Sequence, residues 1–405
     1  MTAATLTRVA GTRGLIVTLG LLQILAWGST FYLLGVLGKP IAADTGWPFA
    51  GVISGLSVAL LAGSAISPLV GHTIAARGGR LVLAASSALM ALGLAGMALS
   101  PTLPTYLAAW AVLGLGMATG LYDPAFSTLG QLYGQDARRL ITAVTLFGGF
   151  ASTVSWPATA FLLDHIGWRA TCWTYAGVNL GLGMPTYLLL VPRQPTLSAK
   201  AVLPSSARTK ELPLILHGRA LLILGAILTI SAGMMSLLTT HLLALLQARG
   251  LGLAAAVGLG TLVGPSQVAS RVIEIFFGRG HHPVWTMLGG CVLVAAGAGL
   301  LWSGWPLPAL ALIAYGMGNG INSIVRGTVP LVLFGPGRYP VLMGKLGLPI
   351  LLAMALAPAA GAILIQYGGE GLVFGTLAFF STINVVLALV LARLCFISED
   401  SMQKA

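Results

Sequence analysis

Charged side chains are scarce in this chain. Only 7% of its 405 residues are Asp, Glu, Lys or Arg, whereas 57% are hydrophobic and the mean hydropathy is +0.93. A soluble domain carries about 25% charged residues, so the composition excludes a soluble globular protein and predicts an integral membrane protein. Because a transmembrane helix needs about 20 residues, we expect an all-α fold of about twelve transmembrane helices.

Signatures of catalysis are lacking as well. The chain has nine acidic residues, no Walker A loop, no nucleophile elbow and no HExxH motif. The sequence therefore supports neither an ATP-driven pump nor a hydrolytic enzyme. We predict no catalytic residue and no cofactor.

Cysteine is rare, and no metal-binding pattern accompanies it. Cys172, Cys291 and Cys395 lie in or beside separate apolar runs, without a CxxC pair. Isolated cysteines of this kind behave as small hydrophobic residues. His281 and His282 are too few for a metal site. We predict neither a redox centre nor a bound metal.

Positive charge is in excess: Lys and Arg number 21, and the formal net charge is +12. These residues fall between hydrophobic runs and not on one soluble face, so we predict no nucleic-acid partner. Only Lys39, Arg169 and Arg249 occupy loops on one side of the predicted membrane. The other side holds Arg8, Arg13, Arg77, Arg80, Arg138, Arg139, Arg193, Lys200, Arg208, Lys210, Arg219, Arg279, Arg338, Arg393 and Lys404. By the positive-inside rule, both termini are expected in the cytoplasm.

Twelve hydrophobic runs fall into two sets of six. The first set lies near residues 14–37, 49–71, 81–99, 105–130, 140–163 and 171–191, and the second near 219–246, 254–277, 284–303, 307–332, 342–366 and 372–394. A polar stretch rich in Pro, Ser, Lys and Arg separates them. The predicted domains are an N-terminal six-helix bundle (1–191), a cytoplasmic linker (192–218) and a C-terminal six-helix bundle (219–405).

The two predicted halves repeat each other at an offset of about 202 residues. Paired six-helix repeats are a transporter architecture, with the substrate site where the repeats meet. The matched positions are Gly114 and Gly316, Gly116 and Gly318, Arg77-Gly78 and Arg279-Gly280, and, one position short, Gly167 and Gly368.

With this repeat and a glycine-rich turn after span two, the chain resembles the major facilitator superfamily over nearly its whole length. The resemblance implies a secondary transporter whose spans one, four, seven and ten line a central cavity. The family typically carries G-x-x-x-D-R-x-G-R-R after span two, and here Gly71–Arg80 places Ala75 at the acidic position. Arg77 and Arg80 are thus expected to contribute to gating without that carboxylate.

Two features resemble the monocarboxylate transporter and oxalate/formate antiporter branch. One is the sequence LLGVLGKPIAADTGW that follows the first span, and the other is Arg271 near the end of span eight. In that branch the arginine pairs with a substrate carboxylate. The branch often has an acidic residue four positions earlier, where this chain has Gln267.

The stretch Gly264–Glu274 is the most polar part of the predicted spans. Gln267, Arg271 and Glu274 stand at i, i+4 and i+7 and share one face of a helix. Charged residues at mid-membrane are costly and commonly face a functional cavity. We predict that Gln267 and Arg271 bind substrate; the alternative is an Arg271–Glu274 ion pair that only locks helices together.

A second polar stripe lies on span ten, where Asn319, Asn322 and Arg326 stand at i, i+3 and i+7. The guanidinium presents a planar fork suited to carboxylate or phosphate. We predict that all three bind substrate. In span one, Gln23 and Trp27 share a face and are predicted to contact substrate as well.

Asp123 and Glu274 are the only acidic residues within the predicted spans. A membrane carboxylate that faces a cavity is suited to carry protons, and we predict this role for both. Pro124 predicts a kink beside Asp123, and the alternative is that Asp123 only accepts hydrogen bonds. Lys345, early in span eleven, is either a gating residue or a lysine that extends to the headgroups.

These residues predict a secondary transporter that moves a small organic anion of the monocarboxylate kind by alternating access, coupled to protons or to a counter-anion. The alternatives are efflux of a toxic compound, such as a drug or a metalloid species, and a non-transporting membrane sensor or assembly factor. We expect a monomer in the lipid bilayer of a bacterial inner membrane.

Overall fold

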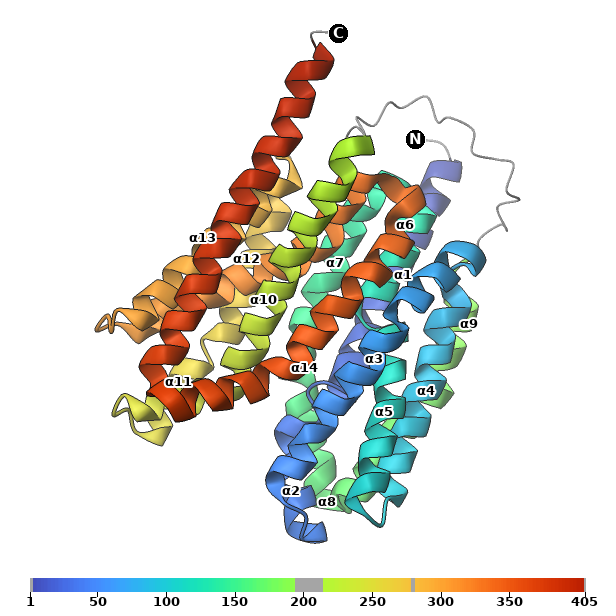
Figure 1. Ribbon diagram of the computed structural model, residues 1–405. Coiled ribbons are helices and arrows are strands. Elements are labelled where there is room, and N and C mark those ends of the chain that lie inside the picture. The colour runs from blue at the N-terminus through green and yellow to red at the C-terminus, as the bar shows by residue number, and fades with distance from the viewer. Residues whose placement is uncertain (1–2, 194–213, 278–280, 404–405) are drawn as a thin grey trace. The chain divides into compact units, whose positions relative to one another are not determined.

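The computed structural model describes residues 3–193, 214–277 and 281–403, and the side chains of most of them. All regular secondary structure in these ranges is helical (Figure 1). The all-α prediction is therefore confirmed. Most of the predicted linker, residues 194–213, lies outside the described ranges.

The chain divides into two compact units. Unit 1 comprises residues 1–204 and 336–348, and unit 2 comprises 205–335 and 349–405. The division between residues 204 and 205 falls in the predicted linker. The short segment Pro336–Leu348, from the second half of the chain, belongs to unit 1 by its contacts.

Unit 1 contains the helices that correspond to the first six predicted spans. These are α1 (Ala3–Gly28), α2 (Leu34–Thr45), α3 (Phe49–Arg77), α4 (Gly79–Leu99), α5 (Leu103–Gly120), α6 (Tyr122–Tyr133), a 3₁₀ turn (Gly134–Asp136), α7 (Ala137–Gly149), α8 (Ala151–Val178), a π-helical segment (Asn179–Gly183) and α9 (Met184–Leu190).

Unit 2 contains most of the remaining helices: α10 (Leu214–Ala248), α11 (Leu253–Gly260), α12 (Val263–Phe277), α13 (Pro283–Trp302) and α14 (Pro308–Gln403). The long α14 is not one straight helix, because non-helical backbone at Gly335, Gly368 and Gly369 divides it into three parts. These parts coincide with predicted spans ten, eleven and twelve.

Seven helical stretches of the described chain are long and apolar enough to cross a membrane. Five of them cover one predicted span each. The other two, Leu103–Leu190 and Pro308–Cys395, have 88 residues each. A straight helix of that length would be about 130 Å long, several times the ~30 Å hydrocarbon core, so each of the two contains several spans.

Spans that the sequence predicts as single helices are interrupted in unit 1. Span one stops at Gly28 and resumes at Leu34. Span four is broken at Leu121, which is extended (φ −77°, ψ −157°), two residues before the predicted kink at Asp123-Pro124. In unit 2, span eight is interrupted at residues 261–262, whereas α10 is continuous.

The predicted repeat has a physical basis in glycine contacts. A Cβ on Gly114 of span four would lie 2.0 Å from the carbonyl oxygen of Ala59 in span two, and one on Gly316 of span ten would lie 2.8 Å from that of Val263 in span eight. Lipid gives no hydrophobic drive for helix pairing, so such close backbone approaches hold the spans together.

The second glycine pair of the repeat packs in the same way. Gly116 faces Met90 of span three, and Gly318 faces Val294 of span nine. Each half therefore packs its fourth helix between its second and third.

Glycines with positive φ also recur between the halves. Gly46 (φ 70°) and Gly250 (φ 86°) follow the first span of each half, and Gly134 (φ 58°) and Gly335 (φ 73°) follow the fourth. Gly167 (φ 76°), between spans five and six, has its counterpart in Gly369 (φ 62°), 202 residues later. The sequence match to Gly368 was thus one residue off: Gly368 has φ −149°.

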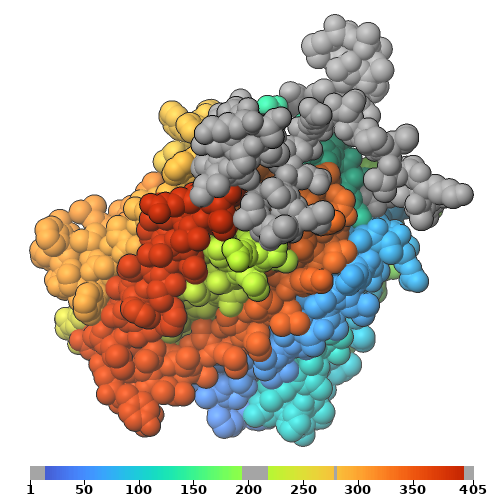
Figure 2. Space-filling view, turned by 45° about the horizontal axis from the view of Figure 1, so that its top comes forward, coloured from blue at the N-terminus to red at the C-terminus, as the bar shows by residue number. Residues whose placement is uncertain are grey.

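The core of unit 2 is built around α10. In Figures 1 and 2, α10 (yellow-green) lies between the orange and red parts of α14. Ser236 donates a hydrogen bond to the carbonyl oxygen of Met354 (2.8 Å), and His241 bonds that of Pro358 (2.8 Å). Leu237, Leu246 and Phe374 belong to the apolar cluster between these helices.

Candidate functional site

Arg271 is a buried arginine inside a membrane-spanning segment of unit 2. Its side chain is 5% exposed. The guanidinium Nε points at the carbonyl oxygen of Gly320 on span ten, 3.5 Å away, which is a long hydrogen bond. The predicted substrate-binding arginine of span eight therefore lies against span ten, which carries the second predicted polar stripe.

Glycine makes this approach of α12 to span ten feasible. A Cβ on Gly320 would lie 2.2 Å from the hydroxyl of Ser270 and 2.4 Å from the carbonyl oxygen of Gln267. No other residue type fits at this position without moving the helices apart. The backbone of Gln267 lies at this contact, and its side chain is partly buried.

Asn319 is a buried donor next to Gly320. Its side chain is 7% exposed, and its amide nitrogen makes no hydrogen bond of ordinary geometry among the residues that the structure describes, although the hydroxyl of Tyr315, one turn earlier, lies close enough to interact with it. An unsatisfied buried donor costs about 1–3 kcal/mol, and such groups commonly have a functional reason. Arg271 thus contacts the residue that directly follows Asn319 in span ten.

The other two members of the span-ten stripe are less enclosed. Asn322 and Arg326 are both partly buried. The carboxamide oxygen of Asn322 lies 3.2 Å from the position that a Cβ on Gly290 would occupy, so Asn322 faces α13.

Glu274, one turn after Arg271 on α12, contacts span nine. Its carboxylate accepts a hydrogen bond from the hydroxyl of Thr286 on α13 at 3.1 Å, and the side chain is partly buried. Within unit 2, spans eight, nine and ten therefore share a set of polar groups in an otherwise apolar bundle.

In unit 1, Gln23 joins the interruptions of spans one and four. Its amide nitrogen donates to the carbonyl oxygen of Gly120, the last residue of α5, at 2.8 Å. Its amide oxygen accepts from the indole N–H of Trp27 at 3.2 Å. Gln23 is fully buried, and both ends of its amide are bonded within the protein.

Aromatic rings gather around the same two interruptions. The ring of Trp27 lies 5.0 Å from that of Tyr122 and 5.4 Å from that of Phe31, measured between centroids. Tyr32 in turn packs edge-on against Trp156 of α8 at 6.1 Å. Trp27 is partly buried, so one side of this cluster remains accessible.

Asp123 lies in the first turn of α6, directly after the interruption of span four. The N-terminal end of a helix favours a negative charge. Asp123 is partly buried, and its Oδ2 lies 3.5 Å from the position that a Cβ on Gly347 would occupy. Gly347 belongs to the segment Pro336–Leu348 of unit 1.

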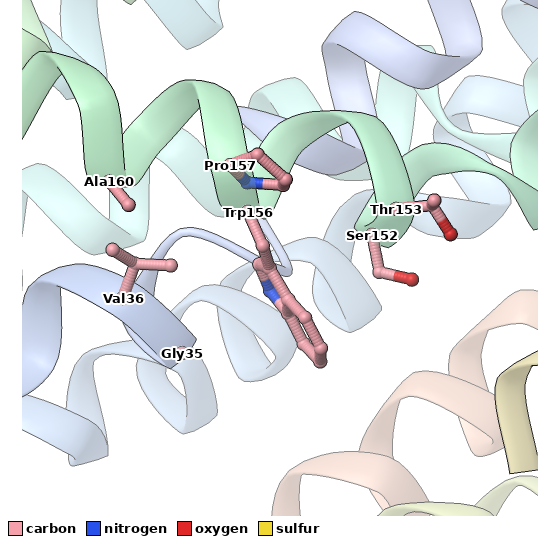
Figure 3. A pocket seen from close by; sticks show the side chains of 7 residues that line it. All are labelled: Gly35, Val36, Ser152, Thr153, Trp156, Pro157 and Ala160. Carbon is pink, nitrogen blue, oxygen red and sulfur yellow. The ribbon is translucent and has the colours of Figure 1, made fainter. Parts of the chain in front are cut away.

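A groove of about 460 Å³ runs between α2 and α8. Figure 3 shows the indole of Trp156 projecting from α8 towards Gly35 on α2. The indole N–H donates to the carbonyl oxygen of Tyr32 at 3.3 Å, so the wall of the groove is continuous with the aromatic cluster. The lining is mostly apolar, with the hydroxyls of Ser152 and Thr153 as its polar groups.

The three predicted gating residues lie at the surface or near it. Arg77 and Lys345 are exposed and Arg80 is partly buried. The turn between Arg77 and Arg80 depends on its two glycines. Gly78 has φ 79°, and a Cβ on Gly79 would lie 1.7 Å from the hydroxyl of Thr128.

Two polar contacts outside the predicted site were missed by the sequence analysis. Asp44 forms an ion pair with Arg169 and accepts a hydrogen bond from the indole N–H of Trp168 at 2.9 Å. The hydrogen bonds from Trp168 and Arg169 lower the pKa of the Asp44 carboxyl below its usual value. The signal in the sequence is the pair Trp168-Arg169 directly before predicted span six.

The other missed contact involves two buried asparagines in the last span of each half. Asn179 bonds the hydroxyl of Ser29, and Asn384 bonds that of Ser231. Both asparagines stand in apolar runs, where a buried amide needs partners.

Comparisons with known proteins bear on this architecture. No curated protein sequence matches the chain. Among solved structures, the human organic anion transporter MFSD10 (TETRAN) is similar with a TM-score of 0.73 at 17% identity, over 93% of this chain and 99% of that one. A double tryptophan mutant of XylE is similar with a TM-score of 0.75 at 13% identity, over 95% of this chain and 96% of that one. The proton:xylose symporter XylE bound to 6-bromo-6-deoxy-D-glucose is similar with a TM-score of 0.68 at 15% identity, over 94% of this chain and 95% of that one.

At these identities the structural matches show the fold alone. The family model of the Major Facilitator Superfamily matches residues 19–325, which is most of the chain. Proteins of this family are membrane transporters and not enzymes. The chain belongs to the Major Facilitator Superfamily.

Proposed function

We propose that this transporter moves a small organic anion by alternating access and that Arg271 binds the anionic group. The observation that carries the proposal is the arginine itself, which is 5% exposed within a span and contacts Gly320, the residue after the buried Asn319.

The charge of Arg271 is permanent, because a guanidinium does not deprotonate in proteins. It also carries five N–H donors in a planar fork. A carboxylate could take two N–H groups of the guanidinium side by side and accept a third from Asn319, which would satisfy the buried amide.

Coupling to protons belongs to the same proposal. Asp123 in unit 1 and Glu274 in unit 2 are the partly buried carboxylates of the spans. Arrival of a negative substrate near Glu274 would favour its protonated form, since a like charge disfavours ionisation. One proton would then accompany one anion.

The similar structures support a transporter without choosing its substrate. One of them is named as an organic anion transporter and another as a proton:xylose symporter. The anion assignment therefore rests on Arg271 and Asn319 and not on the similarity.

The test is uptake by proteoliposomes of radiolabelled formate, acetate, lactate, oxalate and benzoate, with acetamide and benzamide as uncharged controls. We expect at least one carboxylate to be transported and neither amide. Arg271→Lys keeps the charge but loses the fork, and should raise KM about tenfold or more. Arg169→Lys, at an exposed arginine, is the matched control and should leave KM unchanged.

Two outcomes would overturn the proposal. One is wild-type KM in Arg271→Gln for a transported carboxylate. The other is transport of the amides with no transport of any carboxylate.

A second candidate, efflux of an apolar toxic compound, is favoured by a different observation. The aromatic cluster of Trp27, Phe31, Tyr32, Tyr122 and Trp156 adjoins an apolar groove in unit 1. Flat apolar molecules stack on such rings. Transport of a lipophilic cationic dye, with no effect of Arg271→Gln, would favour this candidate.

A further inference from the structure

Each unit fastens its first span to its last with one asparagine. In unit 1, the amide nitrogen of Asn179 donates to the hydroxyl of Ser29 at 3.1 Å. In unit 2, that of Asn384 donates to the hydroxyl of Ser231 at 2.9 Å. Ser29 and Ser231 are 202 positions apart, the offset of the repeat. Both asparagines are buried, at 2% and 1% exposure.

The two contacts differ in the helix that they hold. Ser231 lies in the middle of the continuous α10, and Asn384 also bonds the carbonyl oxygen of Ile227, one turn earlier on that helix, at 3.2 Å. Ser29 instead follows the last residue of α1 and is the first of the five residues that interrupt span one.

Asn179 is itself at an irregular position. It is the first residue of the π-helical segment Asn179–Gly183, and its amide also bonds the carbonyl oxygen of Tyr175 at 2.9 Å. π-type turns inside helices occur frequently at functional positions. In unit 2, no π segment accompanies Asn384 in the part of α14 that the structure describes.

The interruption of span one keeps only part of the helical hydrogen-bond pattern. The Ser29 N–H still bonds the carbonyl oxygen of Leu25 at 2.9 Å, and the Leu33 N–H bonds that of Thr30 at 3.1 Å. The Tyr32 N–H bonds the carbonyl oxygen of Trp27, five residues back, at 3.0 Å. The hydroxyl of Thr30 bonds the carbonyl oxygen of Ala26 at 2.6 Å. Two side chains from other spans also bond this segment: Asn179 at the hydroxyl of Ser29, and Trp156 at the carbonyl oxygen of Tyr32 (3.3 Å). Of the two, Asn179 acts at the point where the chain leaves α1, just after Trp27.

We propose that Asn179 is a positioning residue for transport. Through Ser29 it sets the geometry of the interruption in span one, and with it the placement of Trp27. Interrupted spans are where transporters of this architecture hold substrate and change shape. Asn384 bonds the unbroken helix α10 and therefore only holds two helices together. The proposal does not depend on the substrate being an anion.

Hydrogen–deuterium exchange of the full-length protein in nanodiscs tests this without a substrate. The variants are Asn179→Ala and its matched control Asn384→Ala. Each removes one buried amide, so both should lower the melting temperature by similar amounts. Asn179→Ala should speed amide exchange about tenfold or more in peptides covering residues 27–36. Asn384→Ala should leave exchange in residues 229–238 within about threefold of wild type, because α10 keeps its own hydrogen bonds.

Similar changes in both segments, or no change in residues 27–36, would overturn the proposal. Should Asn179→Ala fail to fold, Ser29→Ala removes the same bond from the other side, with Ser231→Ala as its control. Faster exchange at residues 27–36 in Ser29→Ala, without faster exchange at residues 229–238 in Ser231→Ala, would support the proposal. Unchanged exchange in a folded Ser29→Ala protein would overturn it.

Discussion

At the scale of single residues, the spans contain few polar groups, and most of these have partners. Gln23 illustrates the consequence. The sequence places it on a face with Trp27 and predicts substrate contact, but its amide already joins Gly120 to Trp27. A role in holding the two interruptions together follows more directly from this geometry than contact with substrate does.

Arg326, in the polar stripe of span ten, is the second arginine that we predict to bind substrate. We expect Arg326→Gln to abolish uptake of the transported carboxylate while the protein still folds and reaches the membrane. Uptake is measured in proteoliposomes, and folding is checked by size-exclusion chromatography of the purified variant. Wild-type uptake would place Arg326 outside the mechanism.

Proton coupling is tested at the two carboxylates. Asp123→Asn and Glu274→Gln remove the groups proposed to carry protons, so each variant should retain exchange of labelled for unlabelled substrate. Accumulation driven by a pH gradient should be lost in the double variant. If the double variant still accumulates substrate against its gradient, the protons are carried by other groups.

The ion pair between Asp44 and Arg169 predicts a pH effect on stability. Because Asp44 has a lowered pKa in the folded protein, its contribution is fully present above its ordinary pKa of 3.8 and is lost as the pH falls through the lower folded-state value. Asp44→Asn should therefore flatten the fall in melting temperature in that acid range. Asp136→Asn, at another exposed carboxylate, is the control. An equal effect of both variants would contradict the assignment.

At the scale of elements, glycine decides how the helices pack. Gly114→Ala forces a methyl group to 2.0 Å from a backbone oxygen and should destabilise by about 1–3 kcal/mol or more. Gly316→Ala meets its neighbour at 2.8 Å and should cost less. Gly177 has nothing within 4 Å, so Gly177→Ala should stabilise by about 0.5–1 kcal/mol. Melting temperatures in one detergent test this order, and a different order would contradict the packing account.

The helices and their glycine pairs could be predicted from the sequence, because apolar runs and repeated small residues are local signals. The interruptions could not. Span one contains no proline between Gly14 and Leu37, and its break at Gly28–Leu34 depends on side chains from distant spans. In span four Pro124 signalled irregularity, but the break lies at Leu121, where Gln23 of another helix accounts for the end of α5.

The residues of the candidate site could be predicted from the sequence, but the contacts that these residues make could not. Arg271 and Asn319 stand out because charged and amide side chains are rare in these spans. That Arg271 meets Gly320, and that Glu274 meets Thr286, depends on how three helices pack. Asn179 and Asn384 were overlooked because an isolated asparagine in an apolar run has no periodic signal.

At the scale of the whole molecule, the distribution of basic residues predicts the orientation in the membrane. Both termini should be cytoplasmic, and reporters fused after Arg169 or Arg249 should lie outside. Alkaline phosphatase, active only outside, and green fluorescent protein, fluorescent only inside, distinguish the two sides. A cytoplasmic signal from either fusion would overturn the orientation.

The central claim is that Arg271 binds the transported anion and is not merely half of a structural pair with Glu274. Uptake of the transported carboxylate by the double variant Arg271→Ala/Glu274→Ala tests it most directly. A purely structural pair leaves no uncompensated charge when both partners are removed, so transport would return. The account predicts a folded double variant without uptake, because the group that holds the carboxylate is gone; uptake at the wild-type rate would contradict it.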